Sequence, residues 1–186
     1  MADPANYRQL LTFFREKPDH IQNYFSNFPG LVEDYEWEIS ISYVFARIEV
    51  AKHTTLYCGL VKRHWADAEL TRSTLDRDHI TRERFRSLFK TVFGKPIPDA
   101  IAAKLAAAES VRDRVAHGKQ LKPVQARRGL ADAFDFAEEF SEFVQQLAGF
   151  CPFGDLRGFK GRLETLPKET TRWVLRGMGI PAHPKD

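Results

Sequence analysis

Apolar residues recur every three or four positions over most of the chain, which is the spacing of helices with one buried face. The pattern predicts two short helices, at 5–17 and 19–28, separated at Pro18. The Pro-Gly pair at 29 and 30 is expected to end the second of them. We expect these two helices to form a lid or collar on the main body.

The segment 31–66 fits two patterns. Its stretch "WEISISY" alternates apolar and polar residues as a half-buried strand does. The positions Ile41, Val44, Phe45, Ile48, Ala51, Thr55 and Cys58 instead follow helical spacing. Because the helical spacing continues several turns beyond the alternation, we predict one long helix.

The rest of the chain is predicted to be helical after a polar connection at 67–80. The predicted helices are 81–93, 98–117 and 124–148, with a short one at 167–176. Thr81 can cap the first of them, and Gly94 and Gly118 follow the ends of the first and second.

These elements predict an all-α fold: a helical bundle with long antiparallel helices, N-terminal short helices and a Gly-rich C-terminal extension. We expect residues 1–30 to form the N-terminal helical collar and 31–148 the bundle. Residues 149–186 would be an extension packed on the bundle, so that the chain is a single structural unit. The extension has six glycines but also Phe153 and Trp173, and a disordered tail would not carry so many aromatic residues.

Length and cysteine content favour a reduced cytoplasmic protein. The 186 residues can bury a sizeable core without disulfides, and the two cysteines, Cys58 and Cys151, form neither a framework nor a metal-like spacing. The N-terminus lacks the basic and then apolar layout of a secretion signal. No apolar run approaches the roughly 20 residues that span a bilayer, so we expect no membrane association.

Positive charge is concentrated near the end of the helix predicted at 98–117. The chain carries a net charge of +3, and the segment 112–128 holds six basic residues against one acidic residue. Such a cluster suits a phosphate-bearing partner, although many charge clusters are only solvated loops.

Arg112 and His117 lie on different sides of that helix. At 100° per residue, Arg112 falls within the apolar stripe of Ile101 and Leu105, where an arginine needs a carboxylate, a bound phosphate or a neighbouring subunit. A structural pair with a glutamate of the helix at 124–148 is one interpretation. His117 lies about 140° away and shares its side with Asp113.

These side chains suit the chemistry of RNA cleavage. A histidine can move a proton near neutral pH, and an arginine can bind a phosphate and stabilise its developing charge. RNA supplies its own 2′-OH nucleophile, so a site of this kind needs no metal or other cofactor. A zinc site formed by His53, Cys58, His64 and His79 is disfavoured, because their intervals match no familiar ligand pattern.

The segment "SVRDRVAHGK" resembles the motif of the HEPN superfamily (higher eukaryotes and prokaryotes nucleotide-binding domains). Members of this family carry an Arg, four to six residues and then a His, often with a polar residue after the Arg. Here these are Arg112, Asp113 and His117, and the resemblance covers roughly 31–148. Arg15 and His20 have the same spacing, but Pro18 separates them in a predicted helix break.

The resemblance implies a metal-independent endoribonuclease that leaves a 2′,3′-cyclic phosphate and acts as a toxin or antiviral effector. His117 would be the acid/base, Arg112 the phosphate binder and Asp113 the residue that orients one of them. The peripheral RNA contacts would be Arg114, Lys119, Lys122, Arg127 and Arg128. A protein inhibitor would be a further partner.

The resemblance also implies a homodimer with the two motifs facing each other. The residues Ala102, Ala103, Ala106 and Ala107 lie off the apolar stripe and would allow two copies of the helix at 98–117 to approach closely. Two alternatives remain: a non-catalytic nucleotide-binding or assembly module of the same fold, and a general basic nucleic-acid binder. The last is expected to show more basic residues interleaved with exposed aromatics than the sequence displays.

Overall fold

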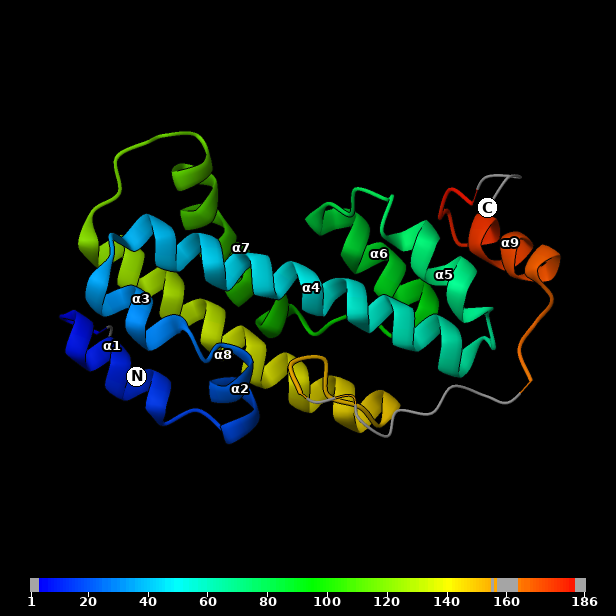
Figure 1. The fold of residues 1–186 in the computed structure, drawn as a ribbon, viewed down its shortest axis with the longest axis horizontal. Helices are drawn as coiled ribbons and strands as arrows, with labels where there is room; N and C mark the ends of the chain where they lie inside the picture. The colour runs from blue at the N-terminus through cyan, green and yellow to red at the C-terminus, as the bar shows by residue number, and fades with distance from the viewer. Residues whose placement is uncertain (1–3, 155, 157–163, 183–186) are drawn as a thin grey trace. The chain divides into compact units, whose positions relative to one another are not determined.

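The computed structural model describes residues 4–154, 156 and 164–182, and every regular element in these residues is an α-helix (Figure 1). The helices are α1 (Tyr7–Arg15), α2 (Asp19–Tyr24), α3 (Phe28–Asp34), α4 (Trp37–Arg63), α5 (Ala68–Leu75), α6 (Arg82–Phe93), α7 (Asp99–Ala116), α8 (Pro123–Ala148) and α9 (Lys168–Gly177). The all-α prediction is therefore confirmed. Of the helices in the described ranges, none combines the length and the apolar character that a membrane span requires.

The chain divides into two compact units, each built from two separate stretches of sequence. The first comprises Met1–Val50 and Pro98–Asp155, and the second comprises Ala51–Ile97 and Leu156–Asp186. The segment predicted as one bundle, 31–148, is thus shared between both units. Part of the predicted Gly-rich extension, at 155 and 157–163, lies outside the described residues.

An aromatic cluster centred on Phe134 of α8 joins the short N-terminal helices to the core of the first unit. The Phe134 ring centroid lies 4.8 Å from that of Phe14 in α1 and 4.7 Å from that of Phe28 in α3. Phe25, just after α2, is 5.4 Å away. All four side chains are at most 2% exposed. The N-terminal helices therefore contribute directly to this hydrophobic core.

Lysines from two other segments neutralise the acidic side of α8. The buried Lys17, after α1, donates hydrogen bonds to Asp135 and, at 2.8 Å, to Glu138. Lys104 of α7 donates to Glu139. Burial lowers the pKa of the Lys104 ammonium, but the hydrogen bond to Glu139 and the nearby acidic charges outweigh it and leave the pKa above its ordinary value. The charged side of α8 thus helps to hold both α1 and α7.

The two helices α7 and α8 pack side by side at very short range (Figure 1). A Cβ atom placed on Gly129 of α8 would lie 2.7 Å from Cγ2 of Val111 in α7, closer than real carbon contacts allow. One side of α8 carries an apolar stripe at helical spacing, buried at Leu130, Phe134, Ala137, Phe140 and Val144 and half-buried at Leu147. Glycine at 129 therefore sets how closely α7 approaches this stripe.

The second unit is built around the end of α4 and helix α6. A Cβ on Gly59 of α4 would lie 2.5 Å from Val92 and 2.6 Å from Phe93, so these helices also meet at a glycine. The neighbouring Cys58 is fully buried. Helix α9 packs on α5, where the backbone N–H of Asp67 donates to Oγ1 of Thr171 at 2.9 Å.

The predicted long helix at 31–66 is wrong at its start. Tyr35 has an extended backbone, with φ −132° and ψ 168°, and it separates α3 from α4. The Pro-Gly pair at 29 and 30 does not end a helix but lies in the first turn of α3. A proline is tolerated there because the first backbone N–H groups of a helix have no partner within it.

The connection predicted at 67–80 was also wrong, because it contains α5. Asp67 caps this helix by accepting a hydrogen bond from the N–H of Leu70 at 2.8 Å. The helix buries Leu70 and Leu75 with two threonines between them, so its core-facing side reads as polar in sequence. The caps predicted for α6 are confirmed: Thr81 accepts from the N–H of Arg84, and Gly94 has a φ of 74°.

We predict that Gly129→Ala destabilises the protein, because the new methyl group would push Val111 and α7 away from α8. Overpacking of this kind costs about 1–3 kcal/mol, whereas alanine gains about 1 kcal/mol over glycine in a helix interior. The measurement is urea unfolding followed by circular dichroism at 222 nm.

The matched control is Gly30→Ala in α3, where a Cβ atom would meet nothing within 4 Å. This variant should be as stable as the wild type or slightly more so. Equal stability of the two variants would show that the approach of α7 to α8 does not depend on glycine.

We predict that Cys58 resists thiol reagents in the folded protein. Burial raises the pKa of its thiol to about 12, so about one molecule in ten thousand carries the reactive thiolate at pH 8. Cys151 is half-buried and should be labelled first by a disulfide reagent such as DTNB. Absorbance should therefore show one fast thiol, which Cys151→Ser removes, and a second that reacts only on addition of denaturant. Two equally fast thiols would contradict the burial of Cys58.

Candidate functional site

The predicted motif lies at the carboxyl end of α7, where backbone hydrogen bonds close the helix. The N–H of Gly118 donates to Val115 O at 3.0 Å, and the N–H of Lys119 donates to Arg114 O at 2.9 Å. Gly118 adopts a φ of 63°, the left-handed conformation that this type of helix end requires. The expectation that Gly118 stops the helix is confirmed.

Arg112 is neither fully buried nor fully exposed. Its guanidinium carbon lies 5.6 Å from the centre of the Phe45 ring in α4. Its Nε is 3.0 Å from Oδ1 of Asp113, an ion-pair contact that lacks the angle of a hydrogen bond. The side chain keeps 37% of its surface exposed. Arg112 therefore combines a cation–π contact with access to solvent.

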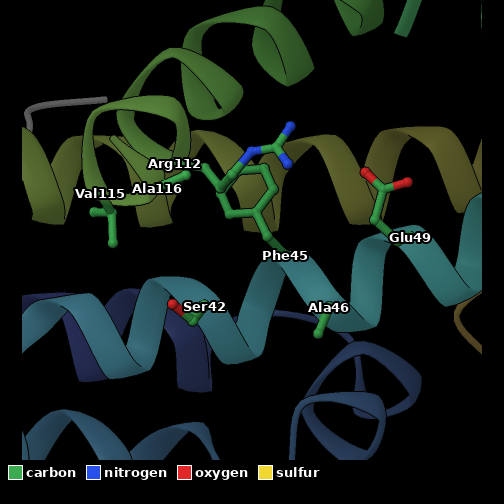
Figure 2. Close-up of a pocket in the computed structure, with 7 residues that line it drawn as sticks. All are labelled: Ser42, Phe45, Ala46, Glu49, Arg112, Val115 and Ala116. Atoms are coloured by element: carbon green, nitrogen blue, oxygen red, sulfur yellow. The ribbon is translucent and has the colours of Figure 1, made fainter. Parts of the chain in front are cut away.

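This arginine lines an open pocket of about 280 Å³ between α4 and α7 (Figure 2). The pocket is lined by Ser42, Phe45, Ala46 and Glu49 of α4 and by Arg112, Val115 and Ala116 of α7. Figure 2 shows the guanidinium over the Phe45 ring, with Glu49 farther along α4. An apolar ring, a cation and a carboxylate thus border one small space, which suits a ligand with both a flat and a charged part.

His117 does not line this pocket. It is the exposed residue that closes α7, with φ −95° and ψ 13°, and its N–H still donates to Asp113 O at 3.1 Å. The backbone at His117 thus continues the helical turn, and the angle of about 140° from Arg112 is preserved. One copy of the chain presents the two side chains on different sides of α7.

The basic side chains predicted to contact RNA differ in their exposure and in their hydrogen bonds. Lys119, Lys122 and Arg128 are exposed. Arg114 is exposed and donates from Nη2 to Gln120 O at 2.9 Å. Arg127 is half-buried, and its Nε donates to Pro4 O at 2.8 Å, which gives this arginine a structural contact.

The alanines proposed for helix approach do not form one free surface. Ala102 is buried within this chain, at 8% exposure, and Ala106 is half-buried. Ala103 and Ala107 are exposed. Only these last two remain accessible for close contact with a second α7.

The other Arg and His with this spacing, Arg15 and His20, do not lie on one helix. Arg15 ends α1, and His20 lies in α2 beyond the break at Pro18. The structure therefore distinguishes two matches that the spacing alone leaves equal, because only Arg112 and His117 share one helix and its closing turn.

The sequence did not single out Glu49 or Phe45 as pocket residues. Phe45 and Glu49 are one turn apart on α4, but nothing in the spacing along α4 reports which residue of α7 lies opposite. Within the described ranges, no three His, Cys, Asp or Glu side chains are grouped to hold a metal ion, and this includes His53, Cys58, His64 and His79.

A scan against protein-family models, a search of curated proteins and a search of solved structures each gave no match to this chain. The resemblance to the HEPN superfamily therefore rests on the motif residues and on their order along the chain.

We predict that Gly118→Ala destabilises the end of α7. A left-handed backbone costs a residue with a Cβ about 1 kcal/mol, although no side chain lies within 4 Å of this position. Gly118→Asn should be milder, because asparagine tolerates this conformation. Hydrogen exchange at the N–H groups of Gly118 and Lys119 measures the fraying.

The control is Gly177→Ala at the end of α9, where φ is not positive and a Cβ also meets nothing within 4 Å. An equal loss of stability in both variants would contradict the role of the left-handed turn.

Proposed function

We propose that this protein is a metal-independent endoribonuclease of HEPN type. Arg112 binds the scissile phosphate, His117 transfers the proton, and Asp113 orients Arg112 through their 3.0 Å ion pair. Two copies of the chain form the complete site. The exposed Arg114, Lys119, Lys122 and Arg128 hold the flanking phosphates of the RNA, with Arg127 beside them.

The observation that carries this proposal is the access of Arg112 to solvent. If Arg112 served only as a structural pair in the bundle, its guanidinium would be enclosed between α7 and α8. It borders the pocket with α4 instead and keeps 37% of its side-chain surface exposed. An accessible guanidinium can bind a phosphate in two-point fashion.

The reaction needs only groups that RNA and this chain supply. The 2′-oxygen forms a bond to the adjacent phosphorus while the imidazole of His117 accepts its proton, and the bond to the 5′-oxygen breaks. The leaving oxygen takes a proton from an imidazolium, which gives a 2′,3′-cyclic phosphate and a 5′-hydroxyl. Arg112 stabilises the additional negative charge on the phosphoryl oxygens.

The two-copy site follows from the angle between the residues. Within one chain Arg112 faces the pocket and His117 does not. A second copy whose α7 end approaches the open side of this pocket would bring the His117 of each chain toward the Arg112 of the other. The exposed Ala103 and Ala107 lie about 180° and 140° from Arg112 around α7, so they would not form this contact.

The proposed biological setting is the cytoplasm, where both free cysteines would stay reduced. A role as a toxin or antiviral effector with a protein inhibitor is what the resemblance to the HEPN superfamily implies.

A specific observation favours a second candidate, a non-catalytic nucleotide-binding or assembly module of the same fold. Phe45 and Arg112 border the pocket, and His117 is absent from it. A base against the ring and a phosphate on the guanidinium would be a binding site without a proton-transfer group.

We predict that the purified protein cuts single-stranded RNA in the presence of EDTA. His117→Ala should lower the rate by about 100- to 10,000-fold, and Arg112→Ala by about 100- to 1,000-fold. His79→Ala and Arg15→Ala are matched controls, because both residues are exposed and lie outside the site. Gel electrophoresis and detection of the cyclic phosphate measure cutting, and circular dichroism checks the fold.

Mixing the two inactive variants tests the shared site. If each site takes Arg112 from one chain and His117 from the other, half of the dimers hold one intact site, so activity should return to about one quarter of the wild-type value. No recovery on mixing would contradict the two-copy site. Full activity of His117→Ala would exclude the proposed reaction and leave the binding module.

A further inference from the structure

Charge is distributed unequally between the two units. The described residues of the first unit carry 11 Lys and Arg against 15 Asp and Glu, a net charge of −4. The described residues of the second unit carry 13 Lys and Arg against 7 Asp and Glu, a net charge of +6. The excess of positive charge thus lies outside the unit that contains Arg112 and His117.

The second unit also presents the most exposed large apolar side chain in the described part of the protein. Trp173 of α9 has 82% of its surface accessible. The adjacent Leu175 and Thr171 are fully buried and fix α9 against the rest of the unit. The indole therefore stands on the outward side of an anchored helix.

One arginine lies a helical turn beyond this indole on α9, and another reaches the end of the helix. Arg176 is one helical turn beyond Trp173 and is exposed, and its Nε donates to Ala182 O at 2.8 Å. Arg84 of α6 also reaches the end of α9, where its Nη2 donates to Gly179 O at 2.9 Å and pairs with Asp78 at 2.7 Å, so its charge is already balanced by a carboxylate. These contacts hold the arginines in place next to the helix that carries the indole.

We propose that the second unit binds single-stranded nucleic acid, with a base stacked on Trp173 and the adjoining phosphate held by Arg176. An accessible indole one helical turn from a fixed guanidinium, in a unit of net positive charge, suits such a chain, because every base has a π-face and every nucleotide a negative charge. The surface is separate from the Arg112 pocket and does not require that the protein cleave RNA.

The chemistry favours a nucleic acid over a lipid surface. Helices that lie on membranes present a row of apolar side chains along one side. In α9, which the structure describes in full, Trp173 is the sole large apolar side chain that is exposed, and its neighbours one turn away are Thr170, Glu169, Arg176 and Gly177. One indole among polar residues suits stacking better than insertion.

The test is fluorescence anisotropy with a 5′-labelled uridine 12-mer, using the full chain with His117→Ala so that the probe stays intact. A thymidine 12-mer distinguishes RNA from DNA. Trp173→Ala should weaken binding of the uridine oligomer by about 5- to 100-fold, the loss expected for one stacked base, and Trp173→Phe should retain most of the affinity. Arg176→Gln should reduce the slope of log K against log salt by about 0.7.

Tyr35→Ala is the matched control. Tyr35 is also exposed, at 59%, but it borders a hollow with Glu33, Asp34, Glu36 and Glu38, where a phosphate would be repelled. Its removal should leave affinity unchanged. Unchanged binding by Trp173→Ala, or binding of phosphatidylserine vesicles without binding of either oligomer, would overturn the proposal. Because binding is measured without cleavage, its loss in Trp173→Ala supports this surface even if the ribonuclease proposal fails.

Discussion

The burial of Phe134 is the contact on which the first unit depends. Phe14, Phe25 and Phe28 approach this ring from three segments of the N-terminal region, and their close packing replaces water on every side of it. The same N-terminal region holds α4, because the Tyr24 hydroxyl donates to Arg47 O at 2.8 Å. Burial raises the pKa of Tyr24 to about 12, so the hydroxyl stays a donor well into the alkaline range. The position of α4 is thus linked, through these short helices, to α8.

The candidate site lies between α4 and α7, and both helices are held in place by α8 and the N-terminal helices. Gly129 lets α7 lie close against α8, while the N-terminal helices hold α4. Between α4 and α7 the Arg112 guanidinium lies over Phe45 and remains accessible. His117 is the residue that ends the same helix, and its side chain lies on a different side of α7 from Arg112. A helix is rigid over such a short distance, so Arg112 and His117 of one chain cannot converge without a second copy or a substrate that reaches both.

The two proposals assign the binding of a nucleic acid and the reaction on it to different units of the chain, which also differ in charge. The unit with Arg112 and His117 is acidic overall, although the segment 112–128 is basic. The second unit carries the larger positive charge and an exposed indole. Long-range attraction depends on net charge, whereas reaction depends on a few placed groups, so the two needs can be met by separate surfaces.

The sequence by itself determined the helical content, the buried stripes of α4 and α8 and the stops at Gly94 and Gly118, because each depends on residues within a few turns of one another. It also determined the angle between Arg112 and His117. It did not determine the break at Tyr35, helix α5, the pocket with Phe45 and Glu49, or the exposure of Trp173, which in sequence reads as part of an apolar group with Leu175. Those features depend on which distant segment packs against each residue, and only the tertiary structure decides that.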